Sequence, residues 1–157
     1  MAEGAASNPR PREAAAATAA ECDAPQRICA SSELAERGRA VLFEVLHYRE
    51  RLRAFALRFD GRVVAYLNRC VHVPVEMDWR PGDFLDSDRE AIICSIHGAS
   101  YAPRSGRCVG GPCGRGALTA LRVEEIAGQV CWYPSRETRA VAAAASGAAA
   151  TAPESTP

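Results

Sequence analysis

The alternation of apolar and polar positions predicts a chain made mostly of β-strands. Residues 53–59 alternate well, residues 63–68 are rich in β-branched and aromatic side chains, and Asp60-Gly61 between them is a strong hairpin signal. Further strands are predicted at 40–46, 91–93, 118–123 and 129–133, the last two joined by a turn at 127–128. One short helix is expected at 32–36, with Gly38 as its stop. The pattern therefore favours a mostly antiparallel β fold.

The two ends of the chain differ from this middle part in composition. Residues 1–24 are rich in Ala and Pro, carry scattered charges and lack the apolar segment of a secretory signal. Residues 137–157 are again Ala-rich and too short in apolar residues to span a bilayer. We expect disordered tails at 1–24 and 137–157 around one domain at 25–136. With neither a signal nor a membrane segment, the expected location is the cytoplasm.

The charge balance excludes one class of partner. The chain has 19 basic and 19 acidic residues, and every basic residue is Arg. No basic excess and no interleaving of aromatic with basic residues argue for nucleic acid. A small domain of about 110 residues with one β core remains.

Two short motifs carry the chemistry of the chain. The first knuckle, residues 70–72, is Cys-Val-His, and the second knuckle, residues 94–97, is Cys-Ser-Ile-His. In an extended segment residues two apart point to the same side, and a turn brings residues three apart together. Each knuckle therefore presents one thiol and one imidazole to the same place. The 21 residues from Val73 to Ile93 suffice for a strand, a turn and a return strand that sets the knuckles side by side.

A mixed Cys/His set fits two kinds of metal centre. Two Cys and two His can hold a tetrahedral zinc ion, although common zinc fingers use a Cys pair and a His pair, whereas each knuckle here is mixed. An iron-sulfur cluster is the other choice. Neutral imidazoles leave its iron less negative than thiolates would, and one unit charge about 4 Å away is worth ~4 kcal/mol at an effective dielectric of about 20. Two imidazoles thus indicate an electron carrier of moderate potential.

The knuckles resemble the signature of the Rieske proteins, C-x-H followed by C-x-x-H, over roughly residues 60–125. The segment from His97 to Tyr101 and the loop Gly110-Gly111-Pro112 also resemble that family. The resemblance implies a Rieske-like antiparallel β domain, with a cluster-binding subdomain at about 68–115 on a larger β base. It also implies a 2Fe-2S cluster with Cys70 and Cys94 on one iron and His72 and His97 on the other. The residues around these ligands would be Gly98, Tyr101, Gly110, Gly111 and Pro112.

Departures from the family pattern narrow the subtype. Members from cytochrome complexes resemble C-x-H-x-x-C and C-x-C-H, with a disulfide between the knuckles, whereas this chain has Val75 and Ile96 at those places. The chain thus looks like the soluble ferredoxin or oxygenase-type domain. High-potential members have a Ser and a Tyr that donate hydrogen bonds to cluster sulfur; here the positions hold Ala99 and Tyr101.

The remaining cysteines and aromatic residues have simpler interpretations. Cys108 and Cys113 flank the Gly-Gly-Pro loop and form a possible disulfide, although free thiols are favoured in a reducing cytoplasm. Three others, Cys22, Cys29 and Cys131, are read as incidental or small buried residues. His47 is read as a surface or half-buried residue, and Met77, Trp79 and Trp132 as packing residues.

The expected function is that of a soluble Rieske ferredoxin, which passes one electron from a reductase to an oxygenase or a similar acceptor. With three histidines in the chain, no pair remains for the mononuclear iron of a terminal oxygenase, so no enzyme activity is expected. The alternatives are a structural or sensory metal-binding subunit, with 2Fe-2S or zinc, and the small subunit of a nitrite-reductase-like assembly. The basic side chains expected near the cluster, where they would attract an acidic partner, are Arg69, Arg104, Arg107 and Arg115.

Overall fold

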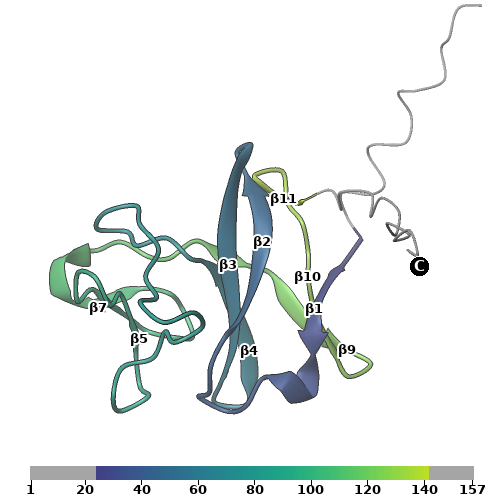
Figure 1. Cartoon of the computed structure of the whole chain (residues 1–157), viewed down its shortest axis with the longest axis horizontal. Helices are drawn as coiled ribbons and strands as arrows, with labels where there is room; N and C mark the ends of the chain where they lie inside the picture. The colour runs from purple at the N-terminus through teal and green to yellow at the C-terminus, as the bar shows by residue number, and fades with distance from the viewer. Residues whose placement is uncertain (1–23, 142–157) are drawn as a thin grey trace, which may run out of the picture.

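The computed structural model describes residues 24–141, which form strands in three antiparallel sheets (Figure 1). The first sheet has the order β1 (Gln26–Ala30), β10 (Gln129–Trp132), β9 (Val123–Ile126). The second has the order β11 (Thr138–Ala140), β2 (Val41–His47), β3 (Glu50–Phe59), β4 (Arg62–Leu67), β8 (Ala120–Leu121). The third joins β5 (Ile92–Ile93), β6 (Ser100–Tyr101) and β7 (Cys108–Gly110). The predicted mostly β fold is confirmed.

The three sheets divide the domain into two parts. The first two sheets form the base. The third sheet and the loops of residues 68–117 form the small subdomain, and in Figure 1 β3 and β4 lie between this subdomain and the first sheet. Two short 3-10 turns, η1 (Ser31–Glu33) and η2 (Gly111–Cys113), complete the described elements. No helix in residues 24–141 is long and apolar enough to cross a membrane.

Strand β3 is buried on both faces, and its alternation sorts side chains between two cores. Ala54 and Ala56 point into the core of the base, which also contains Trp132. Phe55 and Leu57 point the other way, into the core beneath the small subdomain. Small residues on one face admit the tryptophan of the first sheet, while large residues on the other support the loops.

Two-residue turns close the main hairpins. At Asp60-Gly61 both residues have positive φ, 50° and 72°, as the primed turns of tight hairpins require. Ala127-Gly128 repeats this pattern between β9 and β10, with φ of 49° and 75°. The β2–β3 hairpin turns through Tyr48-Arg49 with φ of 45° and 71° but has no glycine. That turn therefore carries no sequence signal, and β3 begins three residues before the predicted strand.

Buried polar groups fix the part of the small subdomain that follows the first knuckle. The buried amide of Asn68, just after β4, donates to Asp78 at 2.6 Å and accepts from the backbone N–H of Met77 at 2.8 Å. Asp78 in turn accepts from the N–H of Gly82 at 3.0 Å. These bonds fix residues 77–82, which have little regular structure of their own.

Four expectations from the sequence are wrong in detail. The expected tail at 137–157 begins too early, because β11 continues the second sheet and Thr138 is buried. The expected helix at 32–36 is only the short turn η1. The segment between the knuckles contains a small hairpin around the Leu85–Ile92 bridge rather than two full strands. Trp79, expected to pack, is 78% exposed. The predictions for 1–23 and 142–157, including that for Cys22, lie outside the described residues.

Phe84 makes the contact between base and small subdomain that is easiest to test. Its ring stacks on Phe55 of β3 with centroids 3.7 Å apart and is 1% exposed. We predict that Phe84→Ala lowers the free energy of unfolding by about 3–5 kcal/mol, because it leaves a cavity between the two parts. Urea unfolding measures this loss. Trp79→Ala, an aromatic truncation at an exposed position in the same segment, should change stability by less than about 0.5 kcal/mol. Equal losses would contradict this packing scheme.

Candidate metal centre

The first knuckle follows β4 in a tight loop. The N–H of Cys70 donates to the carbonyl of Val75 at 2.9 Å, which closes the loop around His72. Cys70 is buried at 2% exposure, whereas His72 is exposed. The thiol therefore faces the inside of the small subdomain and the imidazole lies at its surface.

The second knuckle follows β5 and is closed by two backbone bonds. The N–H of Cys94 donates to the carbonyl of Ala99, and the N–H of Gly98 donates to the carbonyl of Cys94, both at 2.8 Å. Gly98 has a φ of +68°, which a side chain would strain, so the closure of this turn favours glycine here. Cys94 is fully buried and His97 half-buried. Both knuckles thus present a deep thiol and a shallower imidazole.

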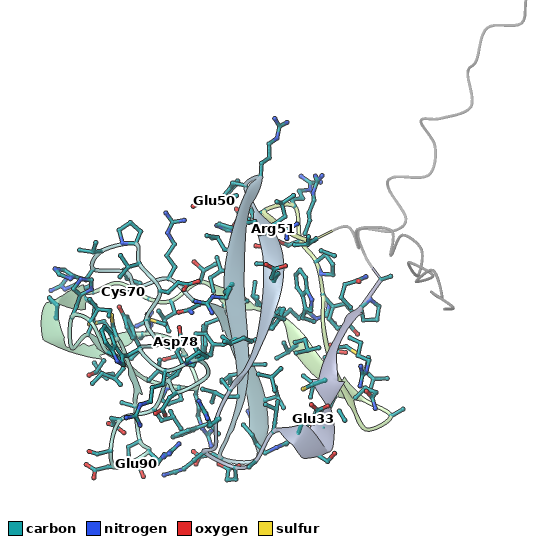
Figure 2. The ribbon with its side chains drawn as sticks, in the orientation of Figure 1. Glu33, Glu50, Arg51, Cys70, Asp78 and Glu90 are labelled. Carbon is teal, nitrogen blue, oxygen red and sulfur yellow. A yellow bond between two sulfur atoms is a disulfide. The ribbon has the colours of Figure 1, made fainter. Side chains whose placement is uncertain are left out.

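The four predicted donors converge. Ligand atoms of Cys70, Cys94 and His97 all lie within 4.8 Å of one another, and Nδ1 of His97 is 3.6 Å from Sγ of Cys94. His72 lies just outside this group, with its ring edge-on to that of His97 and centroids 4.9 Å apart. Figure 2 shows Cys70 among the loops of the small subdomain, on the opposite side of β3 from Glu33. Two thiols and two imidazoles from separate loops therefore share one site.

The surroundings of Cys70 favour its thiolate, which is the form that binds metal. Burial raises the pKa of Cys70, but hydrogen bonds from the Tyr101 hydroxyl, from backbone groups of His72 and Val73 and from the His97 ring outweigh it, and the pKa falls to about 7. For Cys94, burial raises the pKa, and the nearby Cys70 adds to the rise. Two thiolates this close repel each other, and a bound cation would remove that repulsion.

Tyr101 is the predicted neighbour that meets the site most directly. Its hydroxyl oxygen accepts from the N–H of Val71 at 3.2 Å and lies 3.4 Å from Sγ of Cys70. Because the oxygen already accepts from Val71, its proton is free to point at the sulfur. Burial and the bond to Cys70 raise the pKa of Tyr101 to about 12, so the hydroxyl stays protonated. Ala99, by contrast, is buried and offers no hydroxyl.

The Gly-Gly-Pro loop lies against the second knuckle. Gly110 pairs with Ser100 of β6. Gly111 touches the backbone of Gly98, while Pro112 is exposed. The structure joins Cys108 and Cys113 by a disulfide, whereas the sequence left both states open and favoured free thiols. The η2 turn brings their Cα atoms to 5.8 Å, which is an ordinary disulfide spacing.

Some contributors to the site had no signal in the sequence. Val71 received no role from the sequence, yet its N–H donates to the Tyr101 hydroxyl. Gly116 lies beyond every recognised motif but packs directly on Val71. Asn68 holds the segment after the first knuckle, through contacts with residues nine and ten positions further along the chain. Such contacts depend on the tertiary fold and leave no local pattern.

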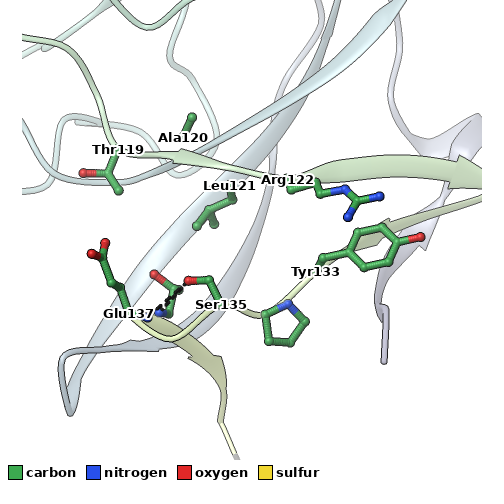
Figure 3. A pocket seen from close by; sticks show the side chains of 9 residues that line it. Thr119, Ala120, Leu121, Arg122, Tyr133, Ser135 and Glu137 are labelled. Carbon is green, nitrogen blue, oxygen red and sulfur yellow. Dashed lines mark hydrogen bonds between the residues drawn. The ribbon is translucent and has the colours of Figure 1, made fainter. Parts of the chain in front are cut away.

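Another concavity, of about 430 Å³, lies on the base between Thr119–Arg122 and residues 133–138 (Figure 3). It has neither Cys nor His in its lining. Arg122 on its wall is committed to Glu124 at 2.6 Å and covers the ring of Tyr133 at 4.2 Å. This groove is separate from the converging donors and contributes nothing to them.

Comparison with solved structures agrees with this architecture. The ferredoxin of carbazole 1,9a-dioxygenase from Nocardioides aromaticivorans IC177 has a TM-score of 0.55 and 19% identity, covering 71% of this chain and 98% of its own. The Sphingomonas yanoikuyae B1 ferredoxin has a TM-score of 0.54 and 20% identity, covering 71% and 100%. A reduced complex between oxygenase and ferredoxin in carbazole 1,9a-dioxygenase matches with a TM-score of 0.55 and 21% identity over 73% of this chain and 28% of that chain. At these identities the likeness shows the fold.

Sequence comparison identifies the family. No curated protein matches the chain. The family described as "Rieske [2Fe-2S] domain" matches residues 24–127, which is most of the described structure and includes both knuckles. The chain therefore belongs to the Rieske [2Fe-2S] domain family, and its cofactor is a 2Fe-2S cluster.

Proposed function

We propose that this protein is a Rieske ferredoxin that carries one electron from a reductase to an oxygenase-type acceptor. The observation that carries the proposal is the convergence of two buried thiols and two outer imidazoles from the two knuckles. The Rieske domain supplies an electron-carrier role. The carbazole dioxygenase structures, which combine a ferredoxin with an oxygenase, support the choice of acceptor. A cytoplasmic location stays a prediction.

The donor set fits the cofactor. Cys70 and Cys94 would hold one iron of the cluster, and His72 and His97 would hold the other. A 2Fe-2S cluster supplies a centre that takes up and releases one electron. The chain contributes neutral imidazoles, which reduce the negative charge at the site, and the Tyr101 hydroxyl, whose proton favours a more negative sulfur.

The remaining histidine supports a carrier rather than a catalyst. His47 lies in β2, where Nδ1 is 2.8 Å from the hydroxyl of Thr138 in β11. It belongs to the second sheet of the base and is not among the donors that converge at the knuckles. The chain's three histidines therefore leave no pair for a mononuclear iron site of the two-His type.

Five exposed apolar side chains lie on the two knuckle loops and the disulfide loop, and we propose them as the docking surface for the acceptor. We call it the apolar rim. Its residues come from three loops: the first knuckle with the residues after it, the second knuckle, and the disulfide loop. Its exposed side chains are Val71 (40%), Val73 (39%), Val75 (37%), Ile96 (47%) and Val109 (63%). Electron transfer needs close approach to the imidazoles, so a partner that binds here excludes water from these side chains.

Part of the basic charge expected at this end is paired within the chain. Arg69 binds Glu50 at 2.9 Å and Arg104 binds Asp60 at 3.0 Å, whereas Arg107 and Arg115 form no ion pair among the described residues. In the acidic segment between the knuckles, Glu76 binds Arg53 and Glu90 binds Arg37. Because these charges are paired within the chain, we favour the apolar rim as the docking surface.

The first test is the cofactor itself. Protein purified without added metal should be red-brown, contain iron and sulfide in equal amounts, and give a Rieske-type EPR signal on reduction. Cys94→Ser should abolish the signal because it removes a ligand, whereas Cys29→Ser, at another buried cysteine in the base, should keep it. A colourless zinc protein, or a signal that survives Cys94→Ser, would contradict the proposal. A cluster that is never reduced by a partner would favour a structural or sensory subunit instead.

The second test concerns the Tyr101 proton. Tyr101→Phe should lower the reduction potential by about 0.05 V, because the lost hydrogen bond is worth about 1 kcal/mol to the reduced state. Protein-film voltammetry measures the potential. Tyr66→Phe is the matched control: Tyr66 is also buried, but its hydroxyl donates to the carbonyl of Pro103 at 2.7 Å. Equal potentials in Tyr101→Phe and the unmodified protein would sink the assigned role.

The third test addresses docking. Ile96→Ser should weaken electron transfer to the oxygenase about five- to tenfold at low protein concentration, because about 1–1.5 kcal/mol of apolar burial is lost. Ile126→Ser makes the same change at a similarly exposed residue of β9, and should have no effect. Stopped-flow measurements at two ionic strengths would give the rates. Equal effects of the two variants, or a loss of rate caused by salt alone, would favour a charged docking surface elsewhere.

A further inference from the structure

A single disulfide closes a short loop next to the site. We call residues 108–116 the clasp; it contains β7, η2 and the Cys108–Cys113 bridge. The N–H of Cys108 donates to the carbonyl of Gly116 at 2.8 Å, and the N–H of Gly116 donates to the carbonyl of Cys113 at 3.1 Å. Covalent and hydrogen bonds therefore hold both ends of the clasp together. Among the six cysteines in residues 24–141, these two are the bridged pair.

The middle of the clasp contacts the residues that follow the second knuckle. A Cβ placed on Gly111 would lie 2.4 Å from the carbonyl oxygen of Gly98 and 2.9 Å from Cα of Ala99, so the two backbones are in direct contact. The neighbouring Gly110 pairs with Ser100 in the third sheet. This contact reaches the residues that immediately follow His97. Displacement of the clasp would therefore free the turn that presents that imidazole.

The C-terminal end of the clasp contacts the first knuckle. A Cβ placed on Gly116 would lie 2.3 Å from Cγ1 of Val71, and Val71 lies between Cys70 and His72. Val71 also donates its N–H to Tyr101, so its position affects the hydroxyl beside Cys70. The clasp is thus one covalently closed segment that touches both knuckles. Val75 and Ile96, where cytochrome-type members have a bridge between the knuckles, are exposed and form no such bond.

We propose that the Cys108–Cys113 disulfide positions the two knuckles, by keeping the clasp closed against Gly98 and Val71. A closed loop has fewer open conformations, so both imidazoles are held in one arrangement at lower entropic cost. A dithiol opens the bridge by donating two electrons and two protons. The bridge becomes two cysteine thiols, and the dithiol is oxidised to its own disulfide. The expected effect on the cluster rests on the proposed function. The expected effect on the backbone of the two knuckles does not depend on a cluster.

The first experiment removes the bridge. Mass spectrometry of the unfolded, alkylated protein, with and without prior reduction by a dithiol, shows whether Cys108 and Cys113 are joined. We expect the double variant Cys108→Ser/Cys113→Ser to lose its visible absorbance to a chelator about tenfold faster than the unmodified protein. Its reduced EPR signal should also broaden, because the imidazoles sample more than one arrangement. Cys131→Ser, which removes an unbridged and half-buried cysteine of β10, is the control and should behave like the unmodified protein.

The second experiment tests the clasp contact with the bridge intact. Gly116→Ala forces a methyl group into Val71, whereas Gly110→Ala adds the same group 3.8 Å from Cβ of Ser100, an ordinary contact. Gly116→Ala should speed cluster loss and increase amide hydrogen exchange about tenfold in residues 70–73, with no change in residues 54–57 of β3. Gly110→Ala should leave both measurements unchanged. This pair keeps the inference testable even if the double cysteine variant fails to fold.

The outcomes separate the clasp from the proposed function. Amide hydrogen exchange in residues 70–73 and 94–99 can be measured on protein without a cluster. If the protein is colourless and exchange in its knuckles rises when the bridge is removed, the proposed role of the disulfide is supported and the proposed electron-carrier function is contradicted. Free thiols at Cys108 and Cys113 in freshly purified protein would overturn the clasp. So would equal exchange and equal cluster loss in the double variant and Cys131→Ser. Uniform loosening of β3 along with the knuckles would show a general loss of stability instead of positioning.

Discussion

The two-sided burial of β3 is the constraint on which the rest of the structure depends. A strand with both faces covered must satisfy two cores at once, and β3 does so by alternating Ala54 and Ala56 with Phe55 and Leu57. The small face lets the first sheet approach closely, with Trp132 filling the space. The large face extends the core under loops that could not form one alone. A shift of register by one residue would put phenylalanine against the first sheet and alanine under the loops, so the strand also fixes its own alignment.

The small subdomain depends on backbone hydrogen bonds and a few buried polar groups rather than on extended sheet. Its strands are two or three residues long, and each knuckle is closed by carbonyls of its own loop. Asn68 holds Met77 and Asp78 in place with both ends of its amide. Bonds between backbone groups are insensitive to side-chain identity, which leaves the surface residues of the loops free to serve docking.

The sequence predicted those parts of the fold and site that local pattern determines. Alternation and the Asp60-Gly61 turn located the central hairpin. The knuckles predicted four donors, of which the structure brings Cys70, Cys94 and His97 within 4.8 Å of one another, with the ring of His72 beside that of His97. The Tyr48-Arg49 turn was invisible because residues with side chains adopt the positive φ usually given to glycine. β1 and β11 exist because the sheets offer them free edges, a condition that only the assembled base provides. Trp79 was misjudged for the same reason, since apolar character does not reveal which loop will cover it.

Pairing of charges within the chain shapes the chemistry of the exposed end. Exposed ion pairs such as Arg104–Asp60 contribute little to stability one by one, because water competes for each partner. Their larger effect is on what remains at the surface. Arg69 and Arg104 are paired with Glu50 and Asp60 of the base, whereas exposed valine and isoleucine side chains lie on the loops that carry the imidazoles. Apolar contact is short in range and tolerates salt. It therefore suits a carrier that must approach closely, transfer its electron and separate better than a strong electrostatic attraction, which would hold the partner in place.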